Sequence, residues 1–248
     1  MNLIRKVFKS ENNFINLFSR SKNYRSFIRY FDDELKDMYD HNFSFIKKDI
    51  NESIYKKILI IKEERKEGHI KISLQNESSF LLEKGFKKEV NLTMVKEDYL
   101  NFEVPSLDFV TYKRYRKNKE IIKDVIVLEK KYYGKEYGED FCERRWLRYA
   151  KKVDEGDNGL DIWAVYDKDT PIAFAYSYYS EEVVATDGLL VIEEYRHRYV
   201  ASNLLKEIAR YYNCPIYLHA DKSDTPKELY NKLGFIIIGE TYDYLLTQ

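Results

Sequence analysis

The chain has 248 residues, of which 44% are hydrophobic and 34% charged, and its 42 Lys and Arg residues balance its 42 Asp and Glu residues. This length suffices for one large domain or two small ones with a real core. A net charge of zero argues against a general nucleic-acid binder, because that affinity comes from many cations that neutralise phosphates.

Cysteine and histidine usage limits the compartment and the metal chemistry. Cys142 and Cys214 form no Cys-x-x-Cys pair, and the four histidines show no ligand spacing. We therefore expect neither a disulfide framework nor a metal site. No apolar run approaches the about 18 residues of a membrane span, and the N-terminus lacks the apolar stretch of a signal peptide. These features predict a cytoplasmic protein that contacts no membrane.

Residues 1–30 are more basic than the rest of the chain. A single acid, Glu11, accompanies the basic residues Arg5, Lys6, Lys9, Arg20, Lys22, Arg25 and Arg29. Two interpretations stay open, a solvated helix surface and a contact with a local anionic partner. RNA is the weaker choice of partner, because the chain has no aromatic and glycine-rich RNA motif.

The pattern up to residue 95 predicts a partial domain. The expected elements are a helix at 51–67, a strand at 69–74, a short helix at 78–84, and a strand that follows Gly85-Phe86 and ends near Val95. Too few residues precede Asn51 for a three-stranded meander, so we expect none there. The segment 102–106, with Pro105, marks the predicted boundary between domains 1–104 and 105–248.

The second part of the chain has a clearer pattern. Its expected elements are a strand at 107–112, amphipathic helices at 121–132 and 142–153, strands at 160–166, 171–179 and 183–191, a helix at 200–212, a strand at 214–219, a short helix at 225–233, and one or two strands over 235–246. Tight turns separate the three strands between residues 160 and 191, which predicts an antiparallel meander.

Two heptapeptides indicate an internal duplication. Residues 80–86 read Phe-Leu-Leu-Glu-Lys-Gly-Phe, and residues 229–235 read Leu-Tyr-Asn-Lys-Leu-Gly-Phe. Aligned on Gly-Phe, the two segments also agree in the order of the surrounding elements. The first copy is predicted to be smaller and degenerate.

Two segments of the second copy point to function. The apolar run Leu189-Leu190-Val191 precedes Arg196-His197-Arg198-Tyr199-Val200-Ala201-Ser202, which predicts a strand, a basic loop and the start of a helix. Such a loop directs backbone N–H groups at an anion, most often a phosphate. The second segment, residues 227–235, predicts a short helix closed by a glycine. Together the two segments resemble the GNAT superfamily of N-acyltransferases.

The resemblance implies a fold and an activity. The fold would be of the α/β (α+β) class, a mixed, mostly antiparallel sheet with helices on both faces, in tandem with a smaller degenerate GNAT-like N-terminal domain. The activity would be acetyl-coenzyme A-dependent N-acetylation of a primary amine that attacks the thioester directly. The alternative is a non-catalytic tandem GNAT-like protein that binds coenzyme A or acts as an interaction module.

The resemblance also implies roles for the residues of the donor site. The backbone of Leu189, Leu190 and Val191 would bond the pantetheine arm, and the loop from Arg196 to Ser202 would hold the pyrophosphate. Tyr199 stands where the family has glycine, a residue that permits φ > 0 and close backbone approach. Tyr230 would protonate the leaving thiolate, a role that Leu81 in the first copy cannot fill.

The general base and the acceptor wall stay open. Asp187 is one candidate base, since strand alternation would place it on the same face as Val191 and burial near the thioester would raise its pKa. His219 is the rival candidate. The acceptor pocket could be lined by Tyr176, Tyr178, Tyr179, Arg144, Arg145 and Trp146, although packing of an aromatic strand under helices explains the same residues.

Overall fold

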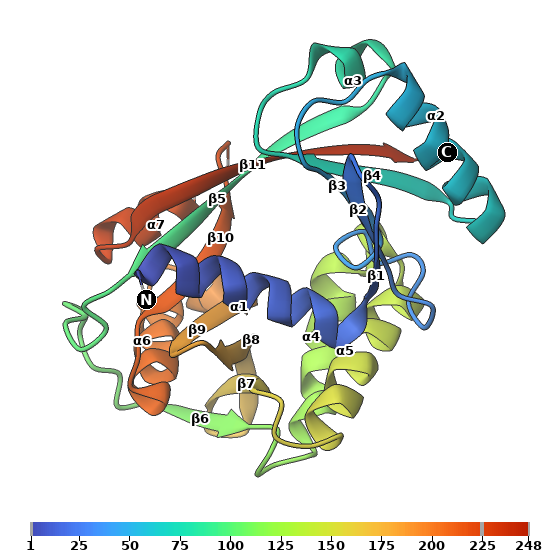
Figure 1. The fold of residues 1–248 in the computed structure, drawn as a ribbon. Coiled ribbons are helices and arrows are strands. Elements are labelled where there is room, and N and C mark those ends of the chain that lie inside the picture. Colours follow the sequence, from blue (N-terminus) through green and yellow to red (C-terminus); the bar gives the residue numbers. More distant parts are fainter. Residues whose placement is uncertain (1, 224–225, 248) are drawn as a thin grey trace. The chain divides into compact units, whose positions relative to one another are not determined.

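The computed structural model describes residues 2–223 and 226–247 (Figure 1). The chain divides into two compact units, and each contains segments that are distant in sequence. The first unit comprises Met1–Glu11, Met94–Leu218 and Leu229–Ile236, and the second comprises Asn12–Thr93, His219–Glu228 and Ile237–Gln248. The domain boundary between residues 104 and 105 stays a prediction.

The elements from residue 110 onward follow the predicted order. They are β6 (Val110–Arg114), α4 (Ile121–Tyr137), α5 (Glu139–Asp154), β7 (Leu160–Asp167), β8 (Thr170–Ser180), β9 (Val183–Val191), a 3-10 turn (Glu193–Tyr195), α6 (Val200–Tyr212), β10 (Ile216–Asp221), α7 (Pro226–Lys232) and β11 (Ile236–Thr247). The region predicted to hold one or two final strands forms the single strand β11. Thr225, the predicted first residue of the short helix, lies outside the described residues.

The predicted meander of the first unit is confirmed, as are helices on both faces of its sheet. Strands β7, β8 and β9 pair in antiparallel order. Trp146 of α5 packs on Phe174 of β8 with ring centroids 5.2 Å apart, whereas Tyr212 of α6 stacks on Tyr179 at 5.3 Å. Phe174 and Tyr179 are five residues apart on one strand, so their side chains point to opposite faces.

The elements before residue 97 are those of the smaller copy. They are α1 (Leu3–Phe18), β1 (Arg20–Asn23), β2 (Phe27–Phe31), β3 (Phe43–Ile46), α2 (Glu52–Arg65), β4 (His69–Leu74), α3 (Ser79–Glu83) and β5 (Lys87–Lys96). Strands β1, β2 and β3 pair in antiparallel order, and β3 pairs with β4 in parallel. The expectation that no meander precedes Asn51 is therefore wrong. The meander fits because its strands have only four or five residues each.

The two copies have the same order of elements and the same pairing directions. The order β1-β2-β3-α2-β4-α3-β5 returns as β7-β8-β9-α6-β10-α7-β11. In each copy two antiparallel pairings are followed by one parallel pairing across a helical connection. The first copy is thus reduced in strand length rather than truncated.

Strand β11, at the end of the chain, belongs from Ile237 on to the second unit, where it pairs with β4 in antiparallel register from Tyr242–Leu74 to Thr247–His69. Its Tyr244 is fully buried, and the Tyr244 hydroxyl accepts the Ser78 N–H at 2.7 Å. The core around it consists of Phe27, Ile46, Tyr55, Ile58, Ile70, Ile72, Leu74, Leu81 and Phe86. Strand β11, which follows the other elements of the second copy, therefore completes the core of the N-terminal copy.

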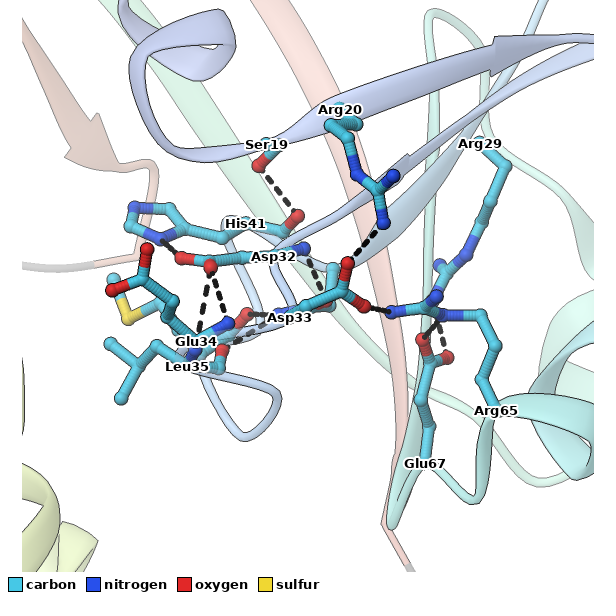
Figure 2. A network of polar contacts seen from close by, with 12 residues as sticks. Ser19, Arg20, Arg29, Asp32, Asp33, Glu34, Leu35, His41, Arg65 and Glu67 are labelled. Atoms are coloured by element: carbon cyan, nitrogen blue, oxygen red, sulfur yellow. Dashed lines mark hydrogen bonds and ion pairs between the residues drawn. The ribbon is translucent and has the colours of Figure 1, made fainter.

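Ion pairs fix the polar interior of the second unit (Figure 2). Glu67 accepts hydrogen bonds from Arg29 and Arg65, and Arg65 also bonds Asp33 at 2.9 Å. The Arg29 and Glu67 side chains are 3% and 1% exposed, so this pair lies in the interior. Arg29 is therefore paired with Glu67 inside the second unit and does not belong to an exposed basic surface.

Lysines of α1 pair with a two-residue hairpin of the first unit. Lys6 binds Glu182, and Lys9 binds Glu181 at 2.9 Å. Both glutamates have left-handed backbone, with φ of +58° and +59°, which is the requirement of a type I′ turn. Among the basic residues of the first thirty, these lysines therefore contact a local anionic group that belongs to the same chain.

Candidate functional site

A β-bulge shapes the strand that is predicted to hold the pantetheine arm. Phe174 of β8 pairs with Leu190 and Tyr176 with Asp187, so that Gly188 and Leu189 both lie opposite Ala175. Gly188 has φ of +62°, the left-handed conformation that glycine adopts in such bulges. A Cβ at this position would lie 3.3 Å from the Tyr176 ring, which also favours glycine.

The bulge overturns the expected alternation along β9. Opposed residues of an antiparallel pair point to the same face, and Asp187 opposes Tyr176 whereas Val191 opposes Ala173. Tyr176 and Ala173 are three residues apart and face opposite sides. Asp187 and Val191 therefore lie on opposite faces, because the extra residue of the bulge shifts the alternation by one.

Asp187 is held by two donors. Its Oδ2 accepts the Tyr176 hydroxyl at 3.0 Å, and its Oδ1 accepts the Gly188 N–H at 2.6 Å. The side chain lies at the surface, so the burial expected for Asp187 is wrong. Its exposed carboxylate can still accept a proton or bind an ammonium group, and its role as a base stays a prediction.

Strands β9 and β10 pair only near their first residues. The register of β9 with β10 joins Val184 to Ile216 and Ala185 to Tyr217, at the first residues of the two strands. The segment from Thr186 to Val191 continues past these pairs. This is the stretch whose backbone is predicted to bond the pantetheine arm as a further strand would.

The basic loop has the backbone that an anion cradle requires. His197 and Tyr199 have φ of +62° and +61°, and Tyr199 is the residue that caps the N-terminus of α6. Left-handed backbone at a non-glycine residue costs about 1–2 kcal/mol. Tyr199 thus adopts, at a cost, the conformation for which glycine is preferred, and the residue is 52% exposed.

Two arginines and a helix N-terminus supply donors around this loop, and Glu193 and Glu194 precede them. The loop residues 196–199 are all exposed, and the first turn of α6 leaves N–H groups with no acceptor within the helix. The Arg196 side chain donates from Nε to the Val191 carbonyl at 3.2 Å, and Arg198 lies over the Tyr195 ring at 5.2 Å. Glu193 approaches Arg196 within 3.9 Å and competes for it. The donor set fits a diphosphate.

Tyr230 lies on the last turn of α7, in a turn that repeats one in the first copy. The Phe235 N–H donates to the Tyr230 carbonyl at 3.0 Å, as the Phe86 N–H donates to the Leu81 carbonyl at 3.2 Å. The glycine that closes each turn has φ of +85°. The alignment on Gly-Phe therefore holds at the level of the backbone, with a phenol in one copy and an isobutyl group in the other.

The ring of Tyr230 is buried beside Phe235 within the first unit. The side chain is 8% exposed, and its ring centroid lies 5.8 Å from that of Phe235. Phe235 in turn contacts Phe102, over which the Lys96 ammonium lies at 5.1 Å. Low exposure of this kind is suited to a positioned proton donor.

The rival base, His219, belongs to the second unit, whereas Asp187 and Tyr230 belong to the first. The His219 Nδ1 lies 3.5 Å from the Thr93 hydroxyl, and the imidazole is exposed. Its role as a base stays a prediction.

The residues proposed for an acceptor wall pack as a core. Trp146, Tyr176 and Tyr178 are buried, and burial raises the pKa of Tyr178. Tyr217 on β10 also has a raised pKa because of burial, so both phenols stay protonated at neutral pH. Arg145 pairs with the buried Glu129. Packing of an aromatic strand under helices explains the buried residues, whereas Tyr179 is exposed and Arg144 pairs with Asp140 at the surface.

Two residues of the site region were not singled out from the sequence. Gly188 forms the bulge, and the Asp-Gly dipeptide inside a strand pattern was the available signal. Asn203 bonds the loop from within α6, and a buried asparagine one turn after a helix start gives only a weak signal. Among the described residues, no cluster of three or more His, Cys, Asp or Glu side chains could hold a metal ion.

Residues 122–235 match the model of the acetyltransferase (GNAT) family. This stretch is similar to the GNAT domain that the model describes. It contains α5, the bulged strand β9, the loop at 196–202 and Tyr230. No curated protein matches the sequence of the chain.

Solved structures resemble the chain over nearly its whole length. A functionally unknown conserved protein from Staphylococcus epidermidis has a TM-score of 0.80 at 19% identity, with 93% of this chain and 94% of that one covered. A GCN5-related N-acetyltransferase from Kribbella flavida has 0.64 at 13%, covering 98% and 95%. A tandem GNAT protein from the clavulanic acid biosynthesis pathway has 0.56 at 8%, covering 97% and 95%. At these identities the likeness establishes the fold.

Proposed function

We propose that the chain is an acetyl-coenzyme A-dependent N-acetyltransferase that acts on a primary amine by direct attack on the thioester. The observation that carries the proposal is the left-handed backbone of Tyr199, φ +61°, at the N-terminus of α6. Tyr199, the one residue that departs from the family's loop pattern, therefore still adopts the left-handed backbone for which the pattern has glycine. The GNAT domain at residues 122–235 supports the same reaction class.

Each proposed role uses a group of this chain. Arg196, Arg198 and the N–H groups from Val200 to Ser202 would bind the pyrophosphate. The backbone of Leu189 to Val191 would bond the pantetheine arm. Acetyl-coenzyme A would supply the acyl group as a thioester.

Proton transfer would need an acid and a base. Tyr230 would donate its phenolic proton to the leaving sulfur, an effect typically worth ~10²–10⁴-fold in rate. Asp187, or His219 in its place, would take the proton of the attacking amine. The acceptor amine would enter beside the Tyr176–Asp187 pair, where the carboxylate is exposed.

The proposed compartment is the reducing cytoplasm. Cys142 and Cys214 are buried free thiols, which supports this assignment. Among the described residues, no helix has the length and apolar character to cross a membrane.

The first test is binding of acetyl-coenzyme A to the full-length protein, followed by thiol release with a panel of primary amines. Ligand at 100 times its dissociation constant should stabilise the fold by about 2.7 kcal/mol. Desulfo-coenzyme A should stabilise to a similar degree without turnover. Absence of any stabilisation at millimolar acetyl-coenzyme A would reject the enzyme and favour the non-catalytic interaction protein. Binding without transfer to any amine would favour a coenzyme A-binding protein.

A further inference from the structure

Asn203 of α6 is bonded to two carbonyl groups from different segments. Its side-chain Nδ2 donates to the Tyr199 carbonyl at 3.0 Å and to the Pro105 carbonyl at 2.9 Å. Its backbone N–H also donates to the Tyr199 carbonyl, at 2.9 Å. The residue is 6% exposed, and both side-chain bonds are thus shielded from water.

These bonds fix the peptide that follows Tyr199. In a trans peptide the C=O of one residue and the N–H of the next point in opposite directions. Two donors from Asn203 draw the Tyr199 carbonyl toward the body of α6, so the Val200 N–H points out of the helix N-terminus. That N–H is one of the groups proposed to bind the pyrophosphate.

The left-handed backbone of Tyr199 explains why its carbonyl needs the bonds from Asn203. The Cβ of a tyrosine disfavours φ near +61°, whereas a glycine adopts this conformation without a steric penalty. Asn203 therefore compensates for the missing glycine. The bonds from Asn203 thus stabilise the strained backbone of Tyr199.

The bond to Pro105 ties the loop to a second segment. Pro105 lies in the irregular stretch between β5, which ends at Lys96, and β6, which begins at Val110. Its carbonyl holds the Asn203 amide in the orientation that reaches Tyr199. The linker thereby takes part in setting the shape of the loop.

We infer that Asn203 is a positioning residue for the pyrophosphate part of the coenzyme A site, acting through the Tyr199 carbonyl. The inference rests on the proposed function and assigns to Asn203 no contact with the ligand. It predicts that loss of the Asn203 donor weakens binding of the pyrophosphate-bearing ligand, spares the pantetheine part, and matters less once residue 199 is glycine.

The test uses the full chain with Asn203→Asp, which keeps the shape but replaces the amide donor with a carboxylate, and with Asn203→Ala as the second variant. Calorimetry gives the Kd of coenzyme A and of pantetheine, which lacks the pyrophosphate. We expect the Kd of coenzyme A to rise about tenfold. The Kd of pantetheine should stay within about twofold of the wild-type value. Adding Tyr199→Gly to either variant should restore most of the lost affinity. Circular dichroism melts report whether each variant is folded.

The outcomes separate the inference from the proposed function. If wild type binds coenzyme A and both folded variants bind it equally well, Asn203 has no positioning role. If the variants bound coenzyme A and pantetheine more weakly by the same factor, or if Tyr199→Gly did not restore coenzyme A affinity, Asn203 would have only a general structural role. If one variant does not fold, the other decides. If the wild-type protein does not bind coenzyme A, both the inference about Asn203 and the proposed function are overturned.

Discussion

Leu81 and Tyr230 occupy the same position in two turns of the same backbone geometry. Each offers its carbonyl to the N–H of the phenylalanine five residues later, at 3.2 Å and 3.0 Å. Leu81 is fully buried in the core of the second unit, whereas Tyr230 keeps 8% exposure. The two turns thus share one backbone geometry, and only one of them carries a side chain that can release a proton.

Tyr230→Phe should lower kcat for acetyl transfer by about 10²-fold and leave the Kd of acetyl-coenzyme A unchanged, because the ring stays and only the acidic proton is lost. Stopped-flow thiol release and calorimetry measure the two quantities. Tyr137→Phe, at an exposed tyrosine of α4, is the matched control and should retain full activity. Equal turnover in wild type and Tyr230→Phe would remove this phenol from the mechanism.

Gly85→Ala should lower the free energy of unfolding by about 1 kcal/mol, since its φ is +85° although nothing lies within 4 Å of the added Cβ. Gly234→Ala should cost at least as much, because the Lys96 Nζ lies 3.1 Å from its added Cβ. Gly68→Ala is the control, with equal space and no positive φ, and should change little. Urea denaturation of the three variants distinguishes backbone strain from crowding. A neutral Gly85→Ala would show that the turn does not require glycine.

Glu67→Ala should destabilise the protein by about 3–5 kcal/mol, because Arg29 would remain buried without its carboxylate. The double variant Arg29→Met with Glu67→Leu should recover most of this loss, since an apolar pair of similar volume needs no compensation. Chemical denaturation of both variants measures the difference. A double variant as unstable as Glu67→Ala would show that the carboxylate is needed for its bond to Arg65 instead.

Acidification should destabilise the protein through His69. Burial lowers the pKa of this imidazole from its ordinary 6.5, and the neutral ring bonds the Asn42 carbonyl. Below about pH 6.5 the unfolded chain therefore binds more protons than the folded one, and stability falls as pH decreases from about 7 to 5. His69→Gln, whose amide can still donate, should show a smaller decrease over that range. Thermal melts at each pH give the comparison, and parallel curves would contradict the assignment.

Glu182→Gly should raise the melting temperature, because glycine adopts φ of +59° without strain and the ion pair of the exposed Glu182 with Lys6 is weak. Glu182→Ala should lower it, since alanine keeps the strain and loses the pair. Scanning calorimetry of both variants decides between the two effects. If Glu182→Gly also lowered the melting temperature, the ion pair with Lys6 would contribute more stability than the relief of backbone strain in the turn.

Much of the second copy was predictable, because its signals are local. The strand at 183–191 was predicted from the turn that precedes it and the helix at 200–212 from its periodicity, and both are confirmed to the residue. The bulge at Gly188 was not, since a shift in register depends on the partner strand. Asn203 was missed for the same reason, as its partner Pro105 is distant in sequence.

The first copy was predicted less well. Its meander strands are too short to show alternation, and β2 reads as an aromatic run rather than a period of two. The pairing of β11 with β4 could not be read from either segment, because both have the apolar pattern of a strand that could pair with several others.

Strand β11 also sets an order of events during synthesis. The ribosome completes β4 long before the residues that pair with it, Tyr242 to Thr247, leave the exit tunnel. Until then β4 has an open edge and the core lacks Tyr244. Nascent chains stalled before residue 240 should therefore recruit holding chaperones through the N-terminal copy, and that copy should become protease-resistant only once residues 242–247 have left the exit tunnel.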